Sequence, residues 1–131
     1  MKVNHIGIVV KNIENSINYY ENHFSYKLVD SVCIDPIQKV RVAFLKPPDQ
    51  NFNFELLEPT TDDSPITNAL RKGGGLNHVC YEVLNIEEAI VDLKKKGSKL
   101  ISGPVPGVVF NEKNVVFMYT EMHEIIELVE I

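Results

Sequence analysis

The sequence has 131 residues, of which 44% are apolar and 24% are charged, with 13 Lys and Arg against 18 Asp and Glu. A chain of this length can bury a sizeable core, and its formal net charge of −5 argues against non-specific binding to nucleic acid. No apolar run approaches the roughly 20 residues that span a bilayer, so we expect no membrane partner. The first residues lack the apolar stretch of a signal peptide, and two cysteines without CxxC spacing are typical of reduced thiols. We therefore expect a cytoplasmic protein.

Alternating apolar residues predict a first strand over Val3–Val10, with Ile6 and Ile8 on one face and His5 on the other. A helix follows, because Asn12 is a good N-cap and apolar residues recur at helical spacing after it. Three further strands are predicted in this half: Lys27–Cys33, Val40–Lys46 and Phe52–Glu58.

The middle of the chain predicts a short helix and a glycine linker. Ser64 and Pro65 are suited to the N-cap and first position of a helix that carries Ile66 and Leu70. The run of three glycines at 73–75 ends this helix, and because it does not follow a strand and open a helix, it is not a phosphate-binding loop. We expect a flexible linker between two halves.

The second half predicts the same order of elements. A strand over Leu76–Val83 precedes a helix that begins after Asn85 and ends near Gly97. Three strands follow: Lys99–Ser102, Val115–Tyr119 and Glu124–Ile131.

The two halves are a sequence repeat. At an offset of 73 residues, the segment 4–14 aligns with 77–87 with six identities in eleven positions, and 42–45 aligns with 115–118. At an offset of 72, 54–58 aligns with 126–130. We predict a single domain, residues 1–131, made of two repeats, 1–62 and 73–131.

The repeat pairs His5 with His78, and Glu55 with Glu127. Taken singly, a histidine at a strand start is more often structural, and a glutamate on an edge strand is usually solvated. Both glutamates, however, sit inside apolar runs, where an isolated carboxylate costs several kcal/mol to bury and needs a cation or a proton. The four side chains are therefore candidate ligands of one divalent metal ion, with mixed nitrogen and oxygen donors.

Several motifs resemble a known family: His-x-Gly near the start, Glu-Leu-Leu-x-Pro, Asp-Ser-Pro-Ile, Leu-Asn-His-Val-Cys-Tyr-Glu-Val and a closing Ile-Glu-Leu-Val-Glu. The chain resembles the vicinal oxygen chelate (glyoxalase/bleomycin resistance) superfamily, in particular methylmalonyl-CoA epimerases and related glyoxalase-like proteins. The resemblance implies an α+β fold of two βαβββ modules, whose mixed sheet curls into an open barrel-like cup with the helices outside. It maps the metal ligands onto His5, Glu55, His78 and Glu127.

The resemblance further implies a metal-dependent isomerase or epimerase that stabilises an enediolate, most simply on an acyl-CoA thioester. The ion would be Co, Ni, Mn, Zn or Fe, since mixed ligands suit them all. Glu127 is the first candidate for the catalytic base and Glu55 the second. Glu82 shares the strand face of His78 and is a third candidate, although a solvated rim position is the simpler interpretation. Members of the family often form homodimers, which we expect here.

Two segments depart from the family's patterns. Residues 104–110 and 119–123 contain neither the His-Pro-Lys run of many epimerases nor the Asp-Pro-Asp-Gly of glyoxalase I. A glyoxalase I-type lactoylglutathione lyase acting on a thiol adduct, a non-catalytic drug-binding protein and another tailoring enzyme therefore remain alternatives. We expect His123 to lie in a surface turn. Lysines and arginines available for coenzyme A phosphates are Arg71, Lys72, Lys94, Lys95, Lys96 and Lys99.

Overall fold

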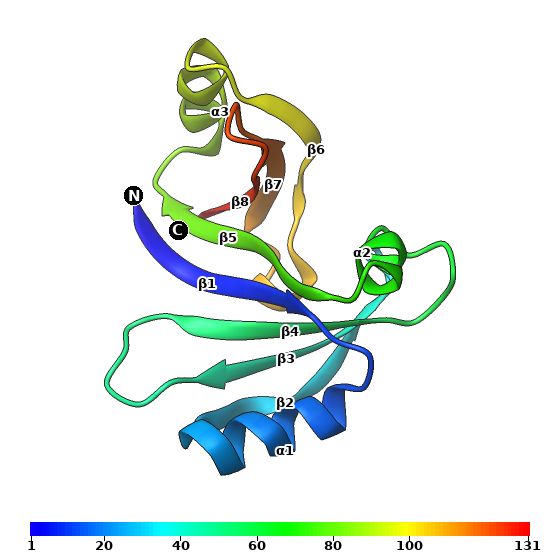
Figure 1. Cartoon of the computed structure of the whole chain (residues 1–131). Coiled ribbons are helices and arrows are strands. Elements are labelled where there is room, and N and C mark those ends of the chain that lie inside the picture. Colours follow the sequence, from blue (N-terminus) through cyan, green and yellow to red (C-terminus); the bar gives the residue numbers. More distant parts are fainter. The chain divides into compact units, whose positions relative to one another are not determined.

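The computed structural model describes residues 1–131 and contains eight strands and three α-helices (Figure 1). The order β-α-β-β-β occurs twice, with the short helix α2 between the two occurrences. The elements are β1 (Lys2–Val9), α1 (Ile13–Phe24), β2 (Lys27–Asp35), β3 (Val40–Lys46), β4 (Asn53–Pro59), α2 (Thr67–Arg71), β5 (Gly75–Val83), α3 (Ile86–Lys95), β6 (Lys99–Pro106), a 3₁₀ turn η1 (Val108–Phe110), β7 (Asn114–Tyr119) and β8 (Ile125–Glu130). The predicted α+β class with two βαβββ modules is confirmed.

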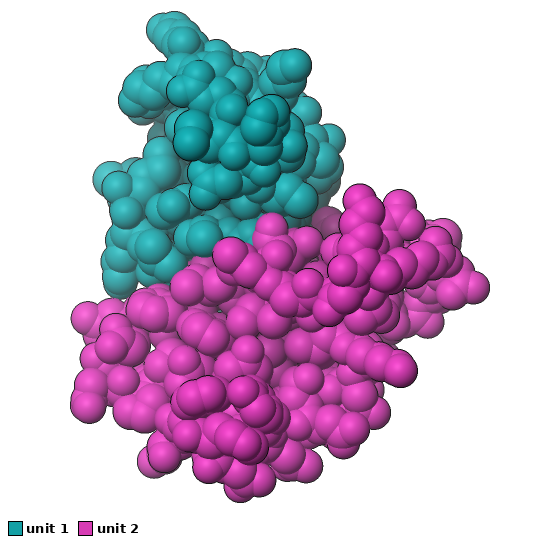
Figure 2. Space-filling model, viewed as in Figure 1, with its two compact units in different colours: residues 1–4, 78–131 teal, residues 5–77 magenta.

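The strand order is β2-β3-β4-β1 in the first module and β5-β8-β7-β6 in the second, and β2 and β6 are edge strands. The sheet is mixed, because β1 pairs with β4 and β5 pairs with β8 in parallel, while the other pairings within each module are antiparallel. Contacts divide the chain into two compact units, residues 5–77 and residues 1–4 with 78–131 (Figure 2). No helix in the structure combines the length and the apolar character that a bilayer crossing requires.

In the unit of residues 5–77, α1 packs on one face of β2, β3 and β4. Ile13 and Ile17 of the helix are buried against Ala43, Leu45 and Leu56 of the strands. The helix begins where predicted, because the side chain of Asn12 accepts a hydrogen bond of 2.9 Å from the backbone N–H of Asn15. Side chains alternate along a strand, so the residues between these core positions point to the opposite face.

The unit of residues 1–4 and 78–131 repeats this construction. Ile86 and Ile90 of α3 are buried against Val116, Met118 and Leu128 of β7 and β8. The side chain of Asn85 accepts a hydrogen bond of 3.0 Å from the backbone N–H of Glu88, which begins the helix as Asn12 begins α1. In both units one face of the sheet is therefore covered by a helix, and the other face carries the predicted ligands.

The region of α2 differs from the prediction in two respects. The helix begins at Thr67, with Ile66 at its N-cap position and without a capping side chain, while Ser64 instead donates to the carbonyl of Gln38. The glycines that follow are tied to the helix, because the N–H of Gly73 and that of Gly74 donate to carbonyls of its last turn. Gly73, Gly74 and Gly75 all have positive φ, which makes the run a defined helix end rather than only a flexible linker.

Replacing Gly74 by alanine is expected to lower the free energy of unfolding by about 2 kcal/mol. Its φ is +71°, and a Cβ atom there would lie 2.6 Å from the backbone oxygen of Val9. Gly73 is the matched control, since it also has positive φ but a Cβ atom would meet no atom within 4 Å. Urea denaturation of both variants measures the difference, and equal stabilities would contradict the importance of this close approach.

Candidate metal centre

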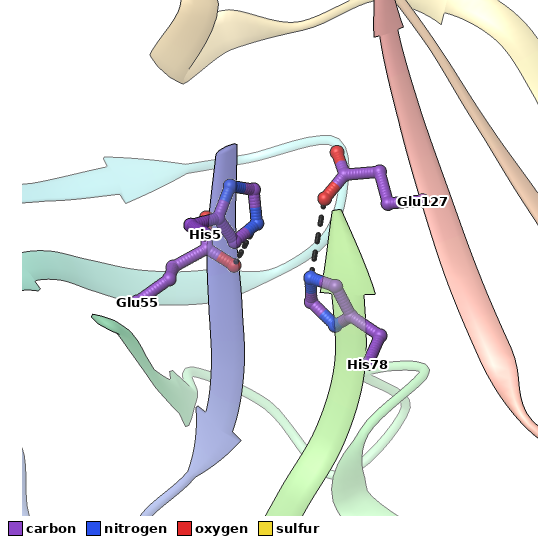
Figure 3. A group of neighbouring side chains, drawn as sticks. All are labelled: His5, Glu55, His78 and Glu127. Atoms are coloured by element: carbon purple, nitrogen blue, oxygen red, sulfur yellow. Dashed lines mark ion pairs between the residues drawn. The ribbon is translucent and has the colours of Figure 1, made fainter. Parts of the chain in front are cut away.

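In the unit of residues 5–77, His5 and Glu55 form a buried pair. His5 lies on β1 and Glu55 on the adjacent parallel strand β4, where the backbone partner of Glu55 is Gly7. The two residues are 0% and 4% exposed. Nε2 of His5 lies 3.4 Å from a carboxylate oxygen of Glu55 (Figure 3). Phe44, directly opposite Glu55 on β3, contacts the His5 ring edge-on with ring centres 5.6 Å apart. The aromatic ring thus helps to fix the imidazole and to exclude water.

The other unit holds an equivalent pair, His78 on β5 and Glu127 on β8. Nε2 of His78 lies 3.1 Å from a carboxylate oxygen of Glu127, and the residues are 3% and 4% exposed (Figure 3). The partner of Glu127 on β5 is Cys80, the repeat equivalent of Gly7. Phe117 lies opposite Glu127 on β7 and meets the His78 ring edge-on at 5.5 Å. The two halves of the chain therefore build the same arrangement from the same positions.

The chemistry of these side chains fits a divalent cation. The four residues are buried and each offers one ligand atom, two imidazole nitrogens and two carboxylate oxygens in all. Two carboxylates out of water carry a large desolvation cost, which a dication would offset while leaving both imidazoles neutral. In each pair the same imidazole nitrogen, Nε2, faces the carboxylate. The residues singled out by the repeat are therefore a group that could hold a metal ion.

Two glutamates that sequence reasoning did not assign a role hold the ligand-bearing strands in place. Glu58, three residues after Glu55 on β4, accepts a hydrogen bond of 2.8 Å from the backbone N–H of Ile13 at the start of α1. Glu130 on β8 accepts an equivalent bond of 2.8 Å from the N–H of Ile86 at the start of α3. Each carboxylate is placed at the positive end of a helix. The signal was present in the repeat, because an offset of 72 aligns the two glutamates.

The third candidate base, Glu82, lies away from the pair in its unit. It is on β5, four residues beyond His78, which places it about 13 Å along the strand. Its carboxylate accepts a hydrogen bond of 3.1 Å from Asn4 and lies 3.8 Å from the ammonium group of Lys2. The structure therefore brings Glu127 to His78 but does not bring Glu82 there.

His123 lies in the turn between β7 and β8, as predicted, and is exposed with a φ of +63°. Its Nδ1 atom is 3.3 Å from the hydroxyl of Tyr119. The apolar segment 108–110 forms the turn η1, and Phe110 packs against a buried cluster of Cys80, Val115 and Val129. This cluster lies on the face of the sheet that carries His78 and Glu127.

Residues 4–117 match the model of the Glyoxalase/Bleomycin resistance protein/Dioxygenase superfamily. The chain belongs to this superfamily, which confirms the resemblance found in its motifs. Among its relatives is human mitochondrial methylmalonyl-CoA epimerase, 35% identical over 120 residues that cover 90% of this chain and 66% of the human protein. The chain thus spans slightly less than two thirds of the length of this relative.

A relative of more similar length is the ethylmalonyl-CoA/methylmalonyl-CoA epimerase of Cereibacter sphaeroides. It is 32% identical over 120 residues, which cover 90% of this chain and 87% of the relative. Among solved structures, the methylmalonyl-CoA epimerase of Mycobacterium tuberculosis superposes with a TM-score of 0.86 at 26% identity, covering 98% of this chain and 86% of that one. The similarity therefore extends through both modules.

Proposed function

We propose that this chain is a divalent-metal-dependent epimerase acting on an acyl-CoA thioester of the methylmalonyl-CoA type. The observation that carries the proposal is the pair of buried His–Glu contacts at repeat-equivalent positions, in a chain whose relatives are named methylmalonyl-CoA epimerases. Epimerisation at a carbon next to a thioester requires removal and return of one proton, and buried carboxylates are suited to this task.

We further propose that His5, Glu55, His78 and Glu127 ligate a single ion, drawn from Co, Ni, Mn, Zn and Fe. Four protein ligands would leave positions open on a six-coordinate ion, which a catalytic site needs. A bound dication would stabilise the negative charge that develops on the thioester oxygen when the α-proton leaves. Phe44 and Phe117 keep both imidazoles in one orientation, so the nitrogen donors are preorganised.

Carboxylates of the protein would transfer the α-proton of the substrate. We assign the removal of the α-proton to a carboxylate oxygen of Glu127, with Glu55 as the alternative. Both residues are buried, so little water competes for the proton. Glu82 is less suited, because its carboxylate is engaged by Asn4 and Lys2.

The direct test is exchange of the α-proton of methylmalonyl-CoA for deuterium, followed by NMR in D₂O with protein reconstituted separately with each of the five metals. We expect exchange that depends on added metal and is abolished by chelation. A parallel assay for thioester formation from methylglyoxal and glutathione tests the lyase alternative. Absence of exchange with every metal would contradict the epimerase proposal, and thioester formation would replace it with the lyase.

A further inference from the structure

A row of side chains runs from His5 across the sheet in the unit of residues 5–77. The partner of His5 on β4 is Asn53. The antiparallel register of β3 and β4 places Lys46, the residue after Leu45, beside Asn53. The partner of Lys46 on the edge strand β2 is Lys27. The row that begins at a proposed metal ligand therefore ends at two lysines directly opposite each other.

Both lysines lie on the same face of the sheet as His5. Along β3, Leu45 packs in the core beneath α1, whereas Phe44 contacts His5 on the other face. Lys46 is two residues from Phe44 and shares its face, because side chains alternate along a strand. Lys27 shares that face too, since directly opposed residues of an antiparallel pair point the same way. The lysines thus lie beyond the His5–Glu55 pair on one continuous surface.

Two like charges lie directly opposite each other in this row, an arrangement that favours the binding of an anion. Directly opposed like charges destabilise a strand pair, yet Lys27 and Lys46 are both exposed in this arrangement. By comparison, Arg41 in this unit lies against Glu58, and Lys39 lies against Asp63. Lysines on an edge strand such as β2 can simply prevent aggregation, but Lys46 is on the inner strand β3. An anion bound between the two ammonium groups would relieve their repulsion.

The separation of the lysines from His5 suits the far end of a long substrate. Three strand spacings of about 4.8 Å place the backbone of Lys27 roughly 14 Å from that of His5. In an acyl-CoA, a flexible pantetheine arm separates the acyl group from the phosphate groups. If the acyl group lies at the His–Glu pairs, the phosphates lie at a distance from them. We propose that Lys27 and Lys46 bind phosphate groups of the coenzyme A moiety, an inference that rests on the proposed acyl-CoA function.

The candidate lysines of the unit of residues 1–4 and 78–131 are less well placed. Lys96 pairs with Asp92 on α3, and this helix packs on the sheet face opposite to the one that carries His78 and Glu127. In the second unit, the position equivalent to Lys46 is Tyr119, which lies opposite Lys99. That unit therefore presents one lysine and a phenol where the first presents two lysines. Because only the unit of residues 5–77 has two opposed lysines, we place the coenzyme A phosphates there.

The test compares two substrates with and without phosphates. In the Lys27→Gln/Lys46→Gln variant, we expect the KM for methylmalonyl-CoA to rise about tenfold and the KM for methylmalonyl-pantetheine to stay unchanged. The wild-type KM for the CoA thioester should rise with salt more steeply than that of the variant. Lys99→Gln is the matched control and should change the KM less than twofold. An unchanged KM for methylmalonyl-CoA in the double variant would overturn the assignment.

Binding of adenosine 3′,5′-bisphosphate separates this inference from the proposed epimerase activity, because the probe carries phosphates but no acyl group. Isothermal titration should give about tenfold weaker binding in the double variant than in the wild type. That result would support the phosphate site even if no epimerisation were found. Equal binding would overturn it even in an active epimerase. If loss of the edge-strand lysine causes aggregation, Lys46→Gln alone is compared, with an expected decrease of about threefold.

Discussion

His5→Ala is expected to remove the metal ion and the activity together. The substitution deletes one of two nitrogen donors and leaves the buried carboxylate of Glu55 without the imidazole 3.4 Å away. Changes in groups that merely support metal ligands lower affinity 10- to 100-fold, so loss of a ligand should lower it by at least about 100-fold. Elemental analysis after reconstitution and dialysis measures this directly, without an activity assay.

The control for this variant is His123→Ala, which removes an exposed histidine from a turn of the other unit. It should retain the wild-type metal content. Metal should also raise the melting temperature of the wild type, because an ion that binds only the folded chain stabilises it, and this shift should be absent in His5→Ala. A His5→Ala protein that retains about one equivalent of metal would show that His5 is not a ligand.

Glu127→Gln is expected to lower the rate of deuterium exchange by about 10³-fold. The amide keeps an oxygen at the metal-facing position but has no basic carboxylate, so proton transfer suffers more than metal binding. Glu55→Gln, its repeat equivalent, should lower the rate less if Glu127 is the base. The rate of α-proton exchange, measured by NMR at saturating metal, separates these two roles.

Glu82→Gln is the matched control for the glutamate series, since this residue contacts Asn4 and Lys2 rather than His78. It should retain exchange within a few-fold of the wild type. A larger loss in Glu55→Gln than in Glu127→Gln would transfer the base assignment to Glu55. A loss of about 10³-fold in Glu82→Gln would identify this residue as the catalytic base.

The local features of the fold could be predicted from the sequence because they depend on neighbouring residues. Strand alternation placed His5 and Ile8 on opposite faces, and the structure packs Ile8 against the core under α1. Asn12 and Asn85 were expected to cap helices, and both accept the expected backbone hydrogen bonds. The predicted start of α2 is wrong by two residues: Ile66, not Ser64, occupies the N-cap position, and the Ser64 hydroxyl donates to the carbonyl of Gln38, which is distant in sequence. The expected homodimer stays a prediction.

The sequence by itself determined the repeat and the four candidate ligands, because duplicated residues keep the same spacing in both halves, and its motifs indicated the fold class through their resemblance to a known family. Only the tertiary structure decided that His5 meets Glu55, 50 residues away, since that contact depends on the parallel register of β1 with β4. The same is true of Phe44 against His5 and of Lys27 opposite Lys46. Such contacts depend on the register of paired strands, which backbone hydrogen bonds between distant segments set. Local sequence patterns by themselves do not specify this register.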